Sequence, residues 1–137
     1  MAGYSPRPLV AKLGIKPGSR IALLNAPRGY TATLGQLPFG VSVTREARGQ
    51  LSFIQFFTRE RHDLEKTLPK LARTLRDDGT IWVSWPKKAS GVATDVTEDT
   101  VREIALPLGL VDVKVCAVDD VWSGLKLVRR LANRRSS

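Results

Sequence analysis

The chain has 137 residues, of which 42% are hydrophobic, and it carries a formal net charge of +9 at pH 7. A chain of this length buries about two-thirds of its unfolded surface, so we expect a single domain over residues 1–131 and a basic, disordered tail over 132–137. Its single cysteine, Cys116, excludes an internal disulfide, and the absence of any apolar run near the roughly 20 residues that span a bilayer, or of a signal peptide, predicts a cytoplasmic protein without membrane association.

The first half of the chain is predicted to contain one short helix and three strands. Residues 8–14 have the proline start, leucine spacing and glycine stop of a short amphipathic helix. The apolar run over 20–25 is typical of a strand buried on both faces, and a short irregular or helical piece follows as far as Gly35. Residues 41–46 alternate as a second strand, and 51–57, rich in aromatic and branched residues, predict a third.

The second half begins with a long helix and a buried strand. Leucines keep helical spacing over residues 60–76, where Pro69 is expected to kink the helix and Gly79 to end it. Residues 80–86 then predict a strand.

A shorter helix and two strands complete the chain. The helix is predicted over 97–105, with either Thr97 or Asp95 as its N-cap. Segments 111–118 and 124–131 flank the sequence DDVWS and predict an antiparallel pair that closes the edge of the sheet.

Strands that alternate with helices predict a fold class of α/β, three-layer and Rossmann-like, with a mostly parallel sheet closed by a C-terminal antiparallel hairpin. This order of elements resembles the end of class I methyltransferase-like domains. A closer resemblance covers nearly the whole chain: it is similar to a bacterial family known as domain of unknown function 3052. The segments that carry it are KLGIKPGSRIALLNAP, WPKKASGVATDVTEDTVREIALPLGLVD and VCAVDDVWSGLKLV. The family resemblance implies no reaction and no ligand.

Basic residues follow two of the predicted parallel strands, where ligands of open α/β sheets usually bind. If one strand lies between them, the two strand ends are about 10 Å apart, which a diphosphate, a nucleotide or an acidic peptide could bridge. The loop after the second strand leads into a helix N-terminus, which favours anions. The alternative is a capped crossover with two solvated lysines. The predicted ligand-binding residues are Arg28, Lys87, Lys88, Ser90, Gly91 and Thr94.

A divergent S-adenosylmethionine-dependent methyltransferase is the enzymatic alternative, although the chain departs from the pattern of those enzymes. The turn after the first strand offers one glycine, Gly29, and Pro27 removes an amide donor from it. The acid expected to bind ribose after the second strand could be Glu46, which is flanked by Arg45 and Arg48. The cofactor therefore stays open, and we lean towards a protein that is not an enzyme.

A nucleic-acid-binding module is the second alternative, and it depends on the charge distribution. Residues 1–57 carry seven Lys and Arg against one acidic residue, and four more arginines lie between 129 and 137. Such segregation favours a polyanionic or acidic partner. Tyr30, Trp85 and Trp122 could stack on bases, although Trp82 and Trp85 must lie on opposite faces of one strand.

Four further side chains could suggest chemistry but receive no catalytic or metal-binding role. Asp119 and Asp120 are typical of a turn, His62 lies on the charged side of its helix, and Cys116 lies on an alternating strand. Trp122, predicted in the same turn, is a candidate contact for a partner. The leading hypothesis is a non-catalytic domain that binds an anionic, nucleotide-like small molecule or an acidic partner.

Overall fold

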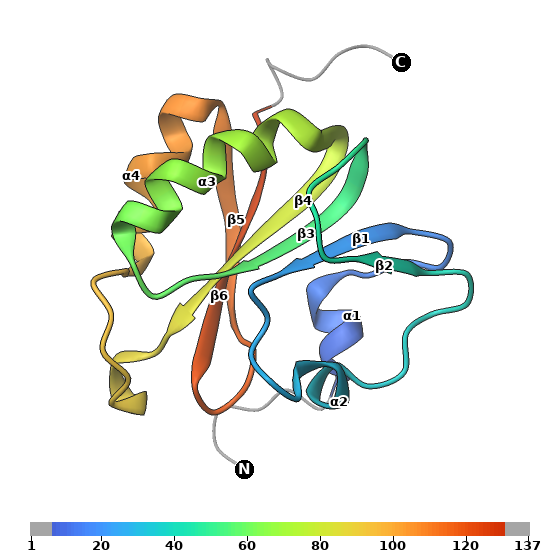
Figure 1. Cartoon of the computed structure of the whole chain (residues 1–137), viewed down its shortest axis with the longest axis horizontal. Coiled ribbons are helices and arrows are strands. Elements are labelled where there is room, and N and C mark those ends of the chain that lie inside the picture. Colours follow the sequence, from blue (N-terminus) through green and yellow to red (C-terminus); the bar gives the residue numbers. More distant parts are fainter. Residues whose placement is uncertain (1–6, 131–137) are drawn as a thin grey trace.

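The computed structural model describes residues 7–130, so the predicted tail over 132–137 lies outside the described part of the chain. The elements follow in this order: α1 (Leu9–Leu13), β1 (Arg20–Leu24), α2 (Tyr30–Leu34), β2 (Ser42–Thr44), β3 (Leu51–Phe57), α3 (Arg61–Thr74), β4 (Leu75–Pro86), the 3-10 turn η1 (Lys88–Ser90), α4 (Glu98–Ala105), the 3-10 turn η2 (Leu106–Leu108), β5 (Leu110–Ala117) and β6 (Trp122–Arg129) (Figure 1).

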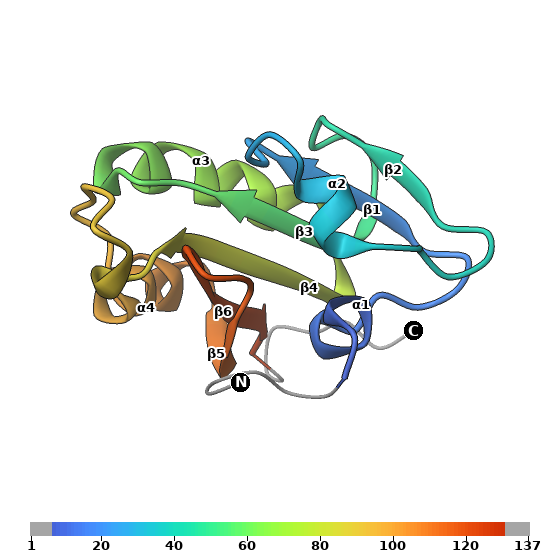
Figure 2. The same ribbon diagram turned by 90° about the horizontal axis from the view of Figure 1, so that it is seen from below.

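The strands form one six-stranded sheet in the order β2-β1-β3-β4-β6-β5. Strands β1 to β4 are parallel, whereas β6 runs antiparallel to both β4 and β5. The sheet twists strongly from β2 to β5 (Figure 2). The predicted class is confirmed, with one added detail: the last strand, β6, is inserted between β4 and β5, so β5 forms the edge.

Helices cover both faces of the sheet. Residues of α3 and α4 build one apolar core, and residues of α1 and α2 build the other. In Figure 1, α3 and α4 lie together at the upper left, and α1 and α2 lie at the lower right. Trp82 packs in the core of α1 and α2 and Trp85 in the core of α3 and α4, so the two lie on opposite faces of β4, as predicted. The indole of Trp82 donates to the Leu13 carbonyl at 2.8 Å.

The boundary between α3 and β4 differs from the sequence prediction. The helix ends at Thr74, and Leu75 already pairs with Leu51 of β3. Gly79 therefore lies inside β4 and does not stop the helix. It is needed for close packing, because a Cβ atom there would lie 2.7 Å from Cδ1 of Leu75 and 3.0 Å from the Leu51 carbonyl oxygen.

The two candidate caps of α4 have separate roles. Thr97 is the N-cap, because its hydroxyl accepts from the Thr100 amide and the Thr100 hydroxyl accepts from the Thr97 amide, each at 3.2 Å. Asp95 instead accepts from the Arg61 amide at 2.7 Å, which satisfies a free N–H in the first turn of α3. Asp95 thus joins the loop before α4 to the start of α3.

Within residues 7–130, no helix is both long enough and apolar enough to cross a membrane.

Candidate functional site

The turn after β1 reverses the chain sharply before α2. Asn25 adopts a φ of 57°, and Gly29 adopts a φ of 82° as the residue that precedes α2. Left-handed conformations of this kind favour asparagine and glycine. The Tyr30 amide donates to the Pro27 carbonyl at 3.0 Å, which closes the turn.

This turn and the end of β2 enclose a hollow of about 680 Å³, which we name the β1 hollow. Its ten lining residues include two exposed arginines, Arg28 and Arg45, and no carboxylate. The β1 hollow is lined by Leu23, Asn25, Ala26, Pro27, Arg28, Gly29, Tyr30, Thr31, Val43 and Arg45. Parallel strands bring both arginines to the same edge of the sheet, because β1 and β2 end there.

Tyr30 fixes the wall of this hollow to the sheet. It is buried, and its hydroxyl donates to Oε1 of Gln55 at 2.6 Å, while Nε2 of Gln55 donates to the Ser84 hydroxyl at 3.2 Å. Burial raises the pKa of Tyr30 well above its ordinary value. Its ring meets Phe57 edge-on, with 4.7 Å between the centroids. The start of α2 is thereby tied to β3 and β4.

A second hollow, the β3 hollow, lies at the end of β3 and has a volume of about 340 Å³. It is lined by Asn25, Phe57, Thr58, Arg59, Glu60, Asp63 and Trp122. Asn25 also lines the β1 hollow, so the two hollows share one wall.

Trp122 is the first residue of β6, so the prediction that it lies in the turn is wrong. It is half-buried and meets Phe57 edge-on at 5.1 Å between ring centroids. Packing therefore explains part of its role. Asp119 accepts the amides of Val121 and Trp122, each at 2.8 Å, as expected for an aspartate in a turn.

Lys87 and Lys88 follow β4 at the same edge of the sheet. The Lys87 amide donates to the Val121 carbonyl at 2.7 Å, and Lys88 begins η1. Neither side chain has a carboxylate partner within residues 7–130, and neither lines the β1 or the β3 hollow. The strand order places β3 between β1 and β4, so one strand separates Arg28 from the two lysines, as predicted.

The loop after Lys88 uses its hydroxyls to hold its own shape. Ser90 donates to the Lys87 carbonyl at 2.7 Å, and Thr94 donates to the Arg59 carbonyl at 2.6 Å. Each hydroxyl also accepts an amide two residues further on. Gly91, with a φ of 76°, ends η1. A third hollow, of about 510 Å³, includes Thr94 and lies beside Arg59.

The sequence prediction did not assign Arg45 to the site. Arg45 directly follows β2, a parallel neighbour of β1, whereas the strand predicted over 41–46 includes it. Glu46, the candidate ribose-binding acid, is exposed and pairs with Arg48 at 2.8 Å. It does not line the β1 hollow.

The remaining candidate residues form neither a metal site nor a reactive thiol in the part of the chain that the structure describes. Residues 7–130 contain no group of three His, Cys, Asp or Glu side chains that could hold a metal ion. Cys116 is half-buried, and burial raises the pKa of its thiol, which disfavours the reactive thiolate.

Comparison with known proteins identifies a family and a fold. The model of the family described as "Protein of unknown function (DUF3052)" matches residues 46–131. No curated protein matches the chain. Among solved structures, a SAM dependent methyltransferase from Aquifex aeolicus superposes with a TM-score of 0.65 at 14% identity, covering 91% of this chain and 89% of that one.

Two further structures are similar in fold. Ribosomal protein L11 methylase from Lactobacillus delbrueckii subsp. bulgaricus has a TM-score of 0.60 at 13% identity, over 89% of this chain and 75% of that one. The fibrillarin pre-rRNA processing protein of Methanococcus jannaschii has a TM-score of 0.61 at 14% identity, over 89% and 73%. At these identities the likeness establishes the methyltransferase-like Rossmann fold alone.

Proposed function

This chain belongs to the family described as Protein of unknown function (DUF3052), and we propose that it is a Rossmann-like domain that binds an anionic, nucleotide-like small molecule in the β1 hollow. One observation carries the proposal. Two arginine residues, Arg28 and Arg45, line the hollow, and no acidic residue does. Guanidinium groups bind phosphate and carboxylate oxygens through paired hydrogen bonds. The hollow's volume of about 680 Å³ is typical of a small-molecule site.

Lys87 and Lys88 extend the positive charge along the same edge. The ends of β1 and β4 are separated by one strand, or about 10 Å. A second phosphate of the ligand, or an acidic segment of a partner protein, would reach the lysines from the β1 hollow. Ser90, Gly91 and Thr94 shape the loop that carries them.

S-adenosylmethionine binding is the second candidate, because the fold is that of SAM dependent methyltransferases. The residues of the β1 hollow oppose it. S-adenosylmethionine carries a sulfonium and an ammonium group against a single carboxylate, so two arginines favour it less than a nucleotide with several anionic oxygens, and Pro27 removes an amide from the turn. Glu46, the acid that could hold a ribose, is engaged with Arg48.

Calorimetric titration with AMP, ADP, ATP, GTP and S-adenosylmethionine tests the proposal. The Arg28→Ala, Arg45→Ala double variant should lose nucleotide binding. A control that removes equal charge elsewhere, Lys16→Ala with Lys114→Ala, should retain it. A nucleotide that binds only the native state raises its stability by about 2.7 kcal/mol at a hundredfold excess over its Kd, so thermal unfolding provides a second readout.

Three outcomes would contradict the proposal. The first is binding of S-adenosylmethionine without binding of any nucleotide, and the second is nucleotide binding that survives loss of both arginines. The third is the absence of a heat signal and of a thermal shift with every nucleotide. A third variant, Lys87→Ala with Lys88→Ala, separates the two parts of the edge: it should weaken binding of ATP more than binding of AMP, because only the longer ligand reaches the lysines.

A further inference from the structure

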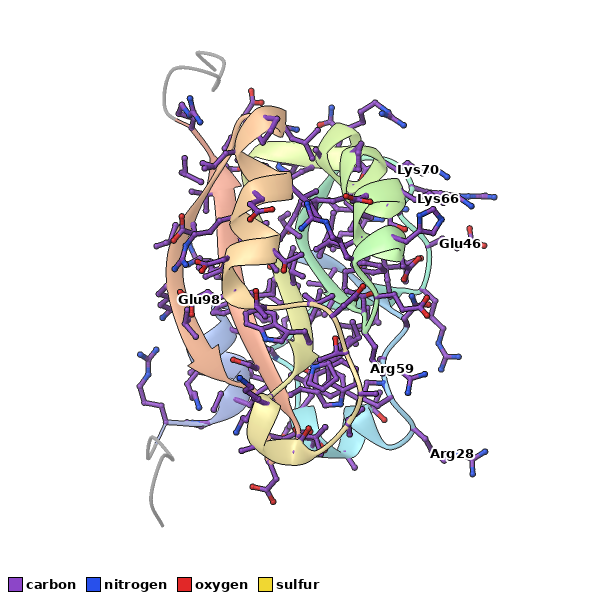
Figure 3. All side chains as sticks on the ribbon, turned by 90° about the vertical axis from the view of Figure 1, so that its left-hand side faces the viewer. Arg28, Glu46, Arg59, Lys66, Lys70 and Glu98 are labelled. Atoms are coloured by element: carbon purple, nitrogen blue, oxygen red, sulfur yellow. The ribbon has the colours of Figure 1, made fainter. Side chains whose placement is uncertain are left out.

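The exposed face of α3 carries a row of basic residues that the anion site does not use. His62, Lys66, Lys70 and Arg73 are all exposed and follow one another at intervals of four, four and three residues. Residues at these intervals lie on one face of a helix. The buried leucines of α3 occupy the opposite face. Lys66 and Lys70 project away from the sheet on the right-hand side of Figure 3.

The acidic residues of α3 do not neutralise this row. Asp63 accepts the Thr58 hydroxyl at 3.1 Å, and Glu65 pairs with Arg61 at 3.0 Å. Within residues 7–130, no carboxylate forms an ion pair with Lys66, Lys70 or Arg73. Like charges four residues apart destabilise a helix. Binding of a polyanion would remove that repulsion.

Arg59 extends the row beyond the start of α3. It is exposed, and Figure 3 shows it projecting to the same side as Lys66, Lys70 and Arg28. We define the basic face as Arg59, His62, Lys66, Lys70 and Arg73. From His62 to Arg73 it extends about 16 Å at a rise of about 1.5 Å per residue. One nucleic acid strand presents a phosphate about every 3.4 Å of axis, so each lysine and arginine of the basic face can contact a different phosphate.

The composition of the basic face indicates the class of partner. The large apolar side chains that are most exposed among the described residues lie on other elements: Phe39, Val43, Leu106, Val113 and Val115. The centre of a protein interface is rich in apolar and aromatic residues and poor in lysine. Phosphate contacts are made by lysine and arginine. An array of cations without an apolar centre therefore fits a nucleic acid better than an acidic protein.

We propose that the basic face docks the phosphate backbone of a nucleic acid, independently of base sequence. No part of this proposal requires the β1 hollow, since Arg28 and Arg45 are outside the basic face. It also places the contact on α3, whereas the sequence suggested the N-terminal half and the C-terminal tail.

Fluorescence anisotropy with a labelled duplex DNA and a labelled single-stranded RNA tests the proposal. Each is titrated with the full chain between about 50 and 200 mM salt. For duplex DNA, log K falls with log salt at about 0.9 per phosphate contact, so Lys66→Gln with Lys70→Gln should reduce the slope by about two. At the lowest salt concentration the affinity should fall at least tenfold. Two sequences of equal length should bind equally.

The matched control is Lys16→Gln with Lys114→Gln, which removes the same charge from exposed residues away from α3. Lys114 lies opposite Lys126 of β6, and Lys126 lies opposite Trp82 of β4, which belongs to the core of α1 and α2. Lys114 is therefore on the face of the sheet that α3 does not cover. This control should retain the wild-type slope. Circular dichroism verifies that both variants are folded. The proposal is overturned by an equal loss in the control, by an unchanged slope without Lys66 and Lys70, or by no binding at low salt. Poly-glutamate that competes as well as the nucleic acid would assign the face to an acidic protein instead.

Discussion

Tyr30 connects the candidate site to the interior through one hydroxyl. Replacement by Phe leaves Oε1 of Gln55 without its donor in a buried position, which should cost about 1 to 3 kcal/mol of unfolding free energy. A pH dependence should accompany this loss. Burial raises the pKa of Tyr30, whereas an unfolded tyrosine ionises near about pH 10. The unfolded state therefore releases its proton first, and stability falls as the pH rises above about 10.

Urea unfolding at a series of pH values measures both effects. The wild-type protein should lose stability above about pH 10 more steeply than Tyr30→Phe, because the variant lacks the titrating group. Below that pH the difference between the two should stay constant. Parallel curves over the whole range would show that Tyr30 is not the linked group.

The sequence predicted a residue of the site only where that residue follows a predicted strand. Arg28 was expected at the mouth because it follows a strand. The same rule missed Arg45, because the strand predicted over 41–46 extends past Thr44, where β2 ends. The partners of Tyr30 and Thr94 could not be predicted. Gln55 and Arg59 lie 25 and 35 residues away, and no local pattern encodes those contacts.

Thr97 and Asp95 are close in sequence but stabilise different helices, so replacing each should loosen a different helix. Thr97→Ala removes the capping box of α4, and Asp95→Ala removes the acceptor at the first turn of α3. Each loss should cost about 1 kcal/mol. Hydrogen exchange should quicken in the first turn of α4 for Thr97→Ala, and at Arg61 and the following amides for Asp95→Ala. If Asp95→Ala loosened α4 alone, the capping assignment would be wrong.

Periodicity identified the elements but not every boundary. The leucine spacing that defines α3 continues through Leu75, so the sequence extended the helix into residues that form β4. Pairing of Leu75 with Leu51 decides the outcome, because it places Leu75 in the core beside Gly79. Helix and strand preferences are too similar over such a short segment for local sequence to separate them.

At the scale of the whole molecule, the alternation of strands and helices predicted the α/β fold class. The position of β6 between β4 and β5 was not predictable, because it depends on pairing between distant segments. The sequence predicted that 111–118 and 124–131 pair with each other. That β6 also pairs with β4, from Ile81 to Pro86, depends on contacts across about 40 residues. The same pairing brings Trp122 beside Phe57 and so completes the β3 hollow.

We propose that residues 1–131 unfold as one cooperative unit, because β3 and β4 contribute side chains to both cores, so that loss of these strands would remove packing from both. Trp82 and Trp85 report the two cores separately. Two variants test this: one keeps only Trp82 and the other keeps only Trp85, with the remaining tryptophans replaced by Phe. In each variant, the fluorescence transition in urea should coincide with the loss of far-UV circular dichroism. The midpoints of the two variants will differ, since loss of Trp82 also removes its bond to Leu13, so the comparison is made within each variant. A fluorescence change that precedes the loss of secondary structure in either variant would show that the two faces of the sheet unfold separately.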